Sequence, residues 1–230
     1  MATRFRFSGL EELPLVTPAF DAAWDDTTIA KRGRCFTFRR SIPFANHEFD
    51  DADETDKNIL LWQFVSPRMT PGQTILYDPA SPPEITAVIR ALEFGASNNM
   101  NLVWGIRVYN DISATFVKTL LPVTRGTNEL PSTTLTSRTF TAGQSAGTYT
   151  TILGDRLIIE SGGGGNPDAA QDHHFLLNYG DDSKFDLAFA DTGTTALCPW
   201  LELESTLTFQ LDPTVILRGA ATLLGGTTLK

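Results

Sequence analysis

The sequence predicts an all-β fold, a β-sandwich of the jelly-roll-like type with an extended N-terminal arm and a C-terminal tail. About eleven short runs rich in β-branched and aromatic residues are separated by turn residues, as in β-sandwiches. Two of these runs, residues 58–66 and 155–161, are apolar enough to form the centre of a sheet. No solenoid period is present.

The length of 230 residues fits one large β domain. We divide the chain into an N-terminal arm (1–32), a β-sandwich domain (33–211) and a C-terminal tail (212–230). The net charge of −9 argues against binding to nucleic acid or to anionic membranes. The first residues form no apolar signal segment, and no apolar run is long enough to cross a bilayer, so we expect synthesis and folding in a cytoplasm.

The arm begins with alternating charged and aromatic residues at 4–7, which predicts one edge strand. Pro14 and Pro18 then interrupt regular structure, although large apolar side chains follow. These side chains need burial, either in the chain's own domain or against a neighbouring subunit. We expect contacts with neighbours through Phe5, Phe7, Phe20 and Trp24 in the arm and through Val215, Ile216 and Leu217 in the tail.

The domain is read as a series of strands joined by polar turns. Residues 47–57 carry six acidic side chains and predict a solvated loop. Four consecutive glycines, 162–165, predict a flexible loop up to residue 172. Residues 84–94 are long enough for a helix, but Pro82 and Pro83 precede them and a strand is favoured. The expected strands are 33–39, 58–66, 73–77, 84–94, 100–109, 114–121, 135–140, 155–161, 175–179, 185–190 and 201–211.

The two cysteines, Cys35 and Cys198, lie in or beside apolar stretches. A buried cysteine behaves as a small hydrophobic residue, so two free thiols are favoured over a disulfide.

Metal and catalytic motifs are sparse. His173 and His174 are adjacent, would point to opposite faces of a strand and do not suggest a zinc site with His47. No nucleophile-elbow motif is present, since Ser161 followed by two glycines matches it only weakly. The sequence leaves open a pair of catalytic carboxylates of the kind that glycosidases use, although most acidic residues lie in expected loops.

Calcium is a better candidate than zinc for a bound metal ion, although the acidic residues do not have the spacing of an EF-hand. Its candidate ligands form two groups: Asp50, Asp51, Asp53 and Asp56, and Asp181, Asp182 and Asp186. Exposed aromatic residues could also stack on sugars. Trp62 and Trp104 are expected in the core, whereas Trp24 and Trp200 are less constrained.

Three stretches, residues 62–67, 154–160 and 194–204, occur in this order with the meander 84–121 between the first two. With these stretches in this order, the chain resembles the β-sandwich virion proteins of tailed bacteriophages. That family includes capsid decoration (cement) proteins and tail or fibre-associated proteins. The resemblance covers roughly residues 58–210 and contains no catalytic motif. It implies a virion location, partners such as the major capsid protein, and a homo-oligomer, with a trimer favoured.

The leading functional hypothesis is therefore a phage decoration protein that acts by binding and not as an enzyme. The alternative is a carbohydrate-binding or host-contacting module of a tail fibre or tail protein. A polysaccharide-degrading enzyme is the third hypothesis.

Overall fold

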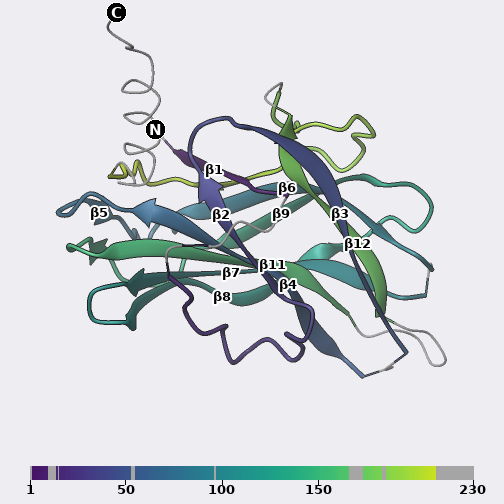
Figure 1. Cartoon of the computed structure of the whole chain (residues 1–230), viewed down its shortest axis with the longest axis horizontal. Coiled ribbons are helices and arrows are strands. Elements are labelled where there is room, and N and C mark those ends of the chain that lie inside the picture. Colours follow the sequence, from purple (N-terminus) through teal and green to yellow (C-terminus); the bar gives the residue numbers. More distant parts are fainter. Residues whose placement is uncertain are drawn as a thin grey trace, which may run out of the picture.

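A computed structural model describes residues 2–9, 14, 16–52, 55–95, 97–165, 173–182 and 185–210. These residues form an all-β structure without helices, which confirms the all-β part of the prediction (Figure 1). The strands are β1 (Thr3–Phe7), β2 (Lys31–Phe36), β3 (Ser41–Asp51), β4 (Lys57–Arg68), β5 (Thr74–Ile75), β6 (Glu84–Glu93), β7 (Met100–Asn110), β8 (Thr115–Glu129), β9 (Thr136–Gly143), β10 (Tyr149–Thr150), β11 (Asp155–Gly165), β12 (His173–Asp182) and β13 (Trp200–Leu203).

Eleven of the strands form one large mixed sheet, and β5 and β10 form a separate pair. The main path runs β3-β12-β6-β13-β1-β2-β4-β11-β7-β8, and β9 pairs with β6. All pairings in the main sheet are antiparallel except that of β2 with β4. Strand β1 pairs with β13 on one side and with β2 on the other, so it joins the two halves of the path.

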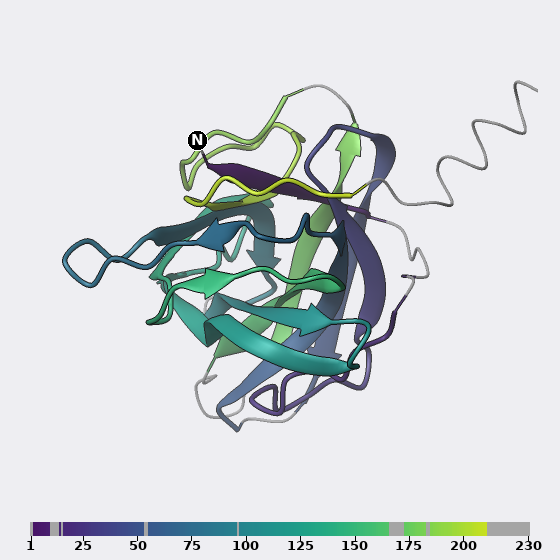
Figure 2. The ribbon, with the colours of Figure 1, turned by 90° about the vertical axis from the view of Figure 1, so that its left-hand side faces the viewer.

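The sheet curls around one main core (Figure 2). Phe7 from β1 shows how distant parts of the path meet there. Its ring centroid lies 4.6 Å from that of Phe64 in β4, 5.6 Å from that of Trp104 in β7 and 6.4 Å from that of Tyr179 in β12. Large apolar surfaces from both halves of the path are thus removed from water together, which is the main favourable term in folding.

The four glycines are part of strand β11, so the flexible loop predicted to begin there is wrong for residues 162–165. They pair with β4 on one side and with β7 on the other. A Cβ atom at Gly162 would lie 1.8 Å from the carbonyl oxygen of Ile59, and one at Gly163 would lie 2.5 Å from the ring of Phe175. Neighbouring strands approach so closely that only glycine fits, which is a different use of glycine from loop flexibility.

The N-terminal arm, as far as it is described, belongs to the chain's own fold. Phe5 and Phe7 are fully buried in the main core. Trp24 is buried with Leu60 and Val103 in a second, smaller core, where Phe20 packs against them. The expectation that Phe5, Phe7 and Trp24 contact neighbouring subunits is therefore corrected, because their own sheet covers them. Strand β1 is also interior to the sheet, not an edge strand.

Among the segments whose boundaries differ from the predictions, three are the acidic stretch, residues 185–190 and the last strand. The acidic stretch is a strand through Asp51, because pairing with β12 stabilises an extended conformation despite the like charges. No strand forms at residues 185–190, where two isolated contacts link the loop to Cys198 and Trp200. The last strand is only Trp200–Leu203, followed by an isolated bridge between Phe209 and Met69.

Val215, Ile216, Leu217 and the rest of the tail lie outside the described residues, as does Asp53. Cys35 and Cys198 are buried free thiols, as predicted. In the described part of the chain, a search for a helix with the length and hydropathy of a membrane span found none.

Candidate binding surfaces

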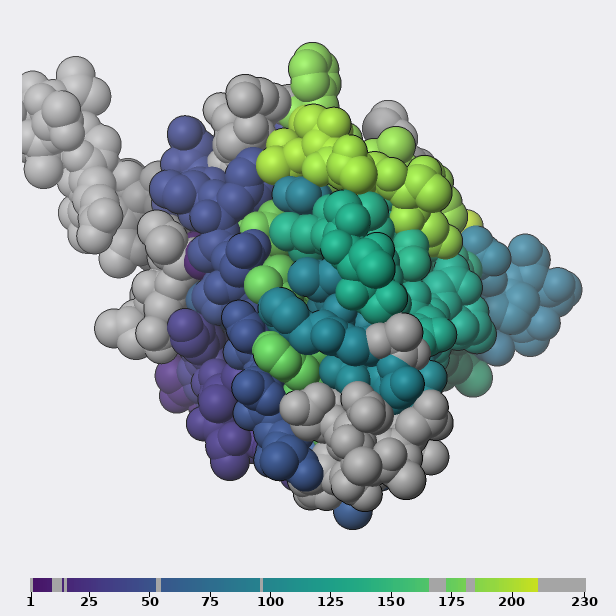
Figure 3. Space-filling view, turned by 90° about the vertical axis from the view of Figure 1, so that its right-hand side faces the viewer, coloured from purple at the N-terminus to yellow at the C-terminus, as the bar shows by residue number. Residues whose placement is uncertain are grey.

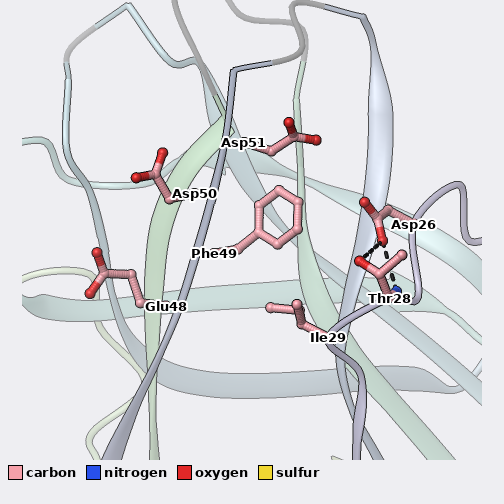
Figure 4. A pocket seen from close by; sticks show the side chains of 7 residues that line it. All are labelled: Asp26, Thr28, Ile29, Glu48, Phe49, Asp50 and Asp51. Carbon is pink, nitrogen blue, oxygen red and sulfur yellow. Dashed lines mark hydrogen bonds between the residues drawn. The ribbon is translucent and has the colours of Figure 1, made fainter.

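A pocket of about 330 Å³ lies between the end of β3 and residues 26–29. Phe49 and Ile29 point into it (Figure 4), and Asp26 and Asp51 stand at its rim. Asp26 accepts hydrogen bonds from the backbone and the hydroxyl of Thr28 at 2.8 and 2.7 Å. The pocket thus combines an apolar floor with an acidic rim.

The first group of calcium candidates does not converge in this pocket. Asp50 points to the opposite side of β3 from Phe49, together with Glu48 (Figure 4). Side chains of successive residues in a strand face opposite ways, so Asp50 and Asp51 cannot hold one ion together. Asp51 pairs with the ammonium of Lys57 at 2.6 Å, and Asp56 pairs with Arg125 at 2.7 Å.

The second calcium group has a different partner. Asp186 pairs with Arg4, Arg6 and Arg39 at 3.0, 2.8 and 3.0 Å. Burial raises the pKa of the Asp186 carboxyl, but hydrogen bonds from Arg6 and Arg4 outweigh burial and hold the net pKa below its ordinary value. Three guanidinium groups repel a cation, so the expectation of Asp186 as a calcium ligand is corrected. Asp181 and Asp182 lie at the end of β12.

Three exposed phenylalanines adjoin this ion cluster, two of them as sequence neighbours of its members and one through a ring contact with Trp200. Phe38 precedes Arg39 in the β2–β3 turn and is 57% exposed, and Phe185 precedes Asp186 and is 73% exposed. Phe189 is 51% exposed, and its ring lies 6.1 Å from that of Trp200, over which Arg4 also packs. We call this set the arginine–phenylalanine surface. It consists of Arg4, Arg6, Phe38, Arg39, Phe185, Asp186 and Phe189.

The electrostatics of this surface oppose those of the whole chain. Arg4 also pairs with Glu202 at 2.9 Å, so three guanidinium groups face two carboxylates. The chain as a whole carries a net charge of −9. Arginine and large aromatic residues are enriched in the centres of protein interfaces, whereas other charged residues are depleted there. The surface therefore has the composition of a protein-binding site.

A buried polar cluster, which the sequence analysis missed, holds residues 16–30 against the sheet. Glu160 in β11 is 1% exposed. Its carboxylate accepts hydrogen bonds from the side chains of Gln63, Arg107 and Trp24, each at 2.9 Å. Arg107 also pairs with Asp21 at 3.2 Å. One signal was present in the sequence: an acidic residue directly after the apolar run 157–159 must be paired if it is buried.

The histidines and Ser161 do not form a catalytic arrangement within the described residues. His173 is fully buried, whereas His174 lies nearer the surface and contacts Glu48 at 2.7 Å, so the two point to opposite faces as predicted. His47 contacts the carbonyl oxygen of Gly9. Ser161 is buried inside β11, where the hydroxyl of Tyr179 donates to it at 3.0 Å.

All four tryptophans are buried. Trp62 and Trp104 are fully buried, as expected, and Trp24 and Trp200 are 5% and 4% exposed. One basis of the carbohydrate-binding alternative was a sugar stacked on an exposed tryptophan. That expectation is corrected, because no tryptophan side chain is exposed.

No family model and no curated protein matches the sequence. Among solved structures, a CocE/NonD family hydrolase from Staphylococcus aureus is similar, with a TM-score of 0.46, 8% identity and coverage of 90% of this chain and 36% of that chain. The VP2 subviral particle of infectious bursal disease virus is similar with a TM-score of 0.27, 13% identity and coverage of 80% and 49%. A structure of the Gx strain of the same virus is similar with a TM-score of 0.26 and 14% identity, and the match covers 82% of this chain and 50% of that chain.

The chain thus spans half or less of the length of these solved chains. They are distant structural resemblances to a hydrolase and to proteins of a virus. With TM-scores below 0.5, these resemblances carry no conclusion about the chain, and no family is assigned to it.

Proposed function

We propose that this chain is a structural component of a phage virion, a decoration protein with a jelly-roll-like domain that binds neighbouring virion subunits. It acts by burial of surface and not by catalysis. The observation that carries the proposal is the arginine–phenylalanine surface, where three exposed phenylalanines adjoin an ion cluster, two in sequence and one through Trp200. Exposed apolar groups gathered in this way are typical of protein interaction sites.

The buried charges of the described residues also fit a structural role. Glu160 fastens the N-terminal segment to the sheet. Asp155 is fully buried and accepts hydrogen bonds from Tyr149, Asn110 and the backbone of Ile152 at 2.7 to 2.8 Å. Asp111 pairs with Arg68 and Arg156 at 2.8 and 2.6 Å. Each of these carboxylates is engaged within the fold and contributes to its rigidity.

The surface fits a partner with an apolar patch and acidic residues at its border. The homotrimer that the sequence resemblance implies is a separate expectation, and the proposal does not depend on it.

The test is cosedimentation of the purified chain with assembled capsids of the phage that encodes it. A variant carrying Phe38→Ser, Phe185→Ser and Phe189→Ser should bind at least about tenfold more weakly, because the centre of an interface dominates its affinity. The matched control replaces Ile112, Ile152 and Leu153, which are 61%, 53% and 56% exposed on other turns, by Ser. Equal binding by both triple variants, or no binding by the unchanged chain, would contradict the proposal.

A further inference from the structure

A group of three exposed aliphatic side chains lies where two turns meet at one end of the sheet. Ile112 in the β7–β8 turn is 61% exposed, and Ile152 and Leu153, just before β11, are 53% and 56% exposed. The N–H of Asp111 donates to the carbonyl oxygen of Gly154 at 2.9 Å, so the two turns are in direct contact. Exposed apolar groups that gather in this way mark interaction sites. We call these three residues the aliphatic patch.

The two turns that carry the patch are packed against each other and against the sheet. A Cβ atom at Gly154 would lie 2.8 Å from the side chain of Ile112, so this isoleucine rests against the backbone of the second turn. The N–H of Ile152 donates to the buried carboxylate of Asp155 at 2.8 Å. The patch is therefore a formed surface at the end of the sheet.

The described part of the chain ends beside this patch. The N–H of Gln210, the last described residue, donates to the carbonyl oxygen of Arg68 at 2.8 Å. The side chain of Arg68 in turn pairs with Asp111 at 2.8 Å, and Asp111 directly precedes Ile112. Two successive contacts thus lead from the end of the described chain to the patch.

A second path of contacts leads to the same place. The N–H of Thr70 donates to the carbonyl oxygen of Thr208 at 2.9 Å. The hydroxyl of Thr151 donates to the carbonyl oxygen of Thr70 at 2.8 Å, and Ile152 directly follows Thr151. Residues 208–210 are therefore joined to both turns of the patch, and the chain that continues from them begins at its border.

The sequence that follows is suited to covering an apolar surface. Pro213 favours an extended backbone, and Val215, Ile216 and Leu217 follow it. The seven residues 211–217 span roughly 23 Å when extended. The path from the last described residue to the patch is shorter, because it consists of one strand spacing of about 5 Å and one pair of side chains. The apolar run can therefore reach the patch.

We propose that residues 213–217 of the tail cover the aliphatic patch of the same chain. The apolar side chains of the tail and of the patch are then removed from water together. Attachment beside the patch keeps the tail at a high effective concentration there, which favours this contact over one with a second copy. The tail thus has a surface on its own chain, in place of the neighbouring subunit that the sequence suggested. The arginine–phenylalanine surface is not involved, so either proposal can fail without the other.

Leu76 offers a matched control for the patch. It is 63% exposed, but the register of β5 with β10 places it beside Thr148, at the opposite end of β10 from Ile152. The exposed residues 78–82 that follow it project from the body as the lighter blue lobe at the right of Figure 3. A change at Leu76 therefore removes exposed apolar surface without touching the patch.

Trypsin cleavage after Arg218 tests the proposal, because cleavage reports the population in which the tail is free. Mass spectrometry of the full chain follows the loss of residues 219–230. The patch variant combines Ile112→Ser, Ile152→Ser and Leu153→Ser. It should be cleaved at this site at least about tenfold faster than the unchanged chain, because the tail loses its apolar contact. Leu76→Ser should leave the rate unchanged. Equal rates for the unchanged chain and the patch variant would overturn the proposal.

Pairs of introduced cysteines show where the tail lies. Leu153→Cys combined with Ile216→Cys should form a disulfide within one chain on mild oxidation, whereas Leu76→Cys combined with Ile216→Cys should link at most about a tenth as fast. The natural thiols of Cys35 and Cys198 are buried and do not compete. A disulfide-linked dimer from the first pair would show that the tail covers a second copy and would overturn the proposal. Equal linking rates for the two pairs would do the same.

Discussion

The indole N–H of Trp24 donates a hydrogen bond of 2.9 Å to the carboxylate of Glu160, a residue 136 positions further along the chain. This contact joins an irregular N-terminal segment to the fully buried strand β11. It shows that residues expected to reach outward are instead used to cover the chain's own sheet.

Replacing Glu160 by Ala should lower the free energy of unfolding by about 3 kcal/mol, because the guanidinium of Arg107 loses a buried partner. Urea denaturation followed by tryptophan fluorescence measures the change. Glu204→Ala serves as the exposed control and should stay within about 0.5 kcal/mol of the unchanged chain. A loss for Glu160→Ala no larger than that of the control would show that the cluster does not stabilise the fold.

Gly162→Ala should be strongly destabilising, by about 3 kcal/mol or more, because its Cβ would lie 1.8 Å from a backbone oxygen that cannot move without shifting β4. Gly143 in β9 is the matched glycine, since a Cβ there meets nothing within 4 Å. Gly143→Ala should therefore be neutral or slightly stabilising. Thermal unfolding of both variants provides the comparison, and similar melting temperatures would refute the close-approach argument.

Glu93 should make the stability of the fold depend on pH. Burial and, to a smaller extent, nearby Glu129 raise the pKa of its carboxyl to about 7, although the N–H of Met100 acts in the opposite direction. The folded state then holds a proton that the unfolded state releases near pH 4.5. The contribution to stability is complete below pH 4.5 and is lost as the pH rises through about 7.

Urea midpoints at pH 5 and pH 8 should therefore differ more for the unchanged chain than for Glu93→Gln, which cannot titrate. Glu84→Gln, at an exposed residue of the same strand, is the control and should keep the full pH dependence. A pH dependence that survives in Glu93→Gln would assign the effect to another group.

Asp186→Asn should destabilise the fold by about 2 kcal/mol at neutral pH, because three guanidinium groups lose their shared counter-charge. The pKa of Asp186 is lowered in the folded state, so the stabilisation it provides is present above its unfolded pKa and is lost as the pH falls through the folded one. The gap between the two proteins should accordingly narrow in acid, as chemical denaturation across acidic pH can measure. A gap that is constant with pH would argue against this charge effect.

The sequence predicted the all-β class and the central strands well, because continuous apolar runs such as those of β4 and β11 depend on composition alone. It failed where long-range pairing decides the outcome. The acidic half of β3 is extended because β12 lies beside it, and no local property of residues 47–51 shows that neighbour. The glycines of β11 were misread for the same reason, since the constraint comes from Ile59 and Phe175 on other strands.

The site residues show the same limit. Phe5 and Phe7 were correctly singled out as apolar side chains that need burial, but their covering surface comes from strands far along the chain. Asp186 was chosen as an oxygen ligand, and only the fold brings Arg4, Arg6 and Arg39 around it. The arginine–phenylalanine surface could not be found from sequence, because the β2–β3 turn and the loop after β12 meet only in three dimensions.

Strand β1 pairs with β13, so Thr3 stands opposite Leu203 in the sheet. During translation, β1 leaves the ribosome long before its neighbour β13 has been made. Phe7 can pack early against Phe64, whereas Phe5, whose ring centroid lies 5.7 Å from that of Phe209, gains this partner only after some two hundred more residues have been added. Closure of such a distant pair is slow, and apolar surface that stays exposed in the meantime favours aggregation of the nascent chain.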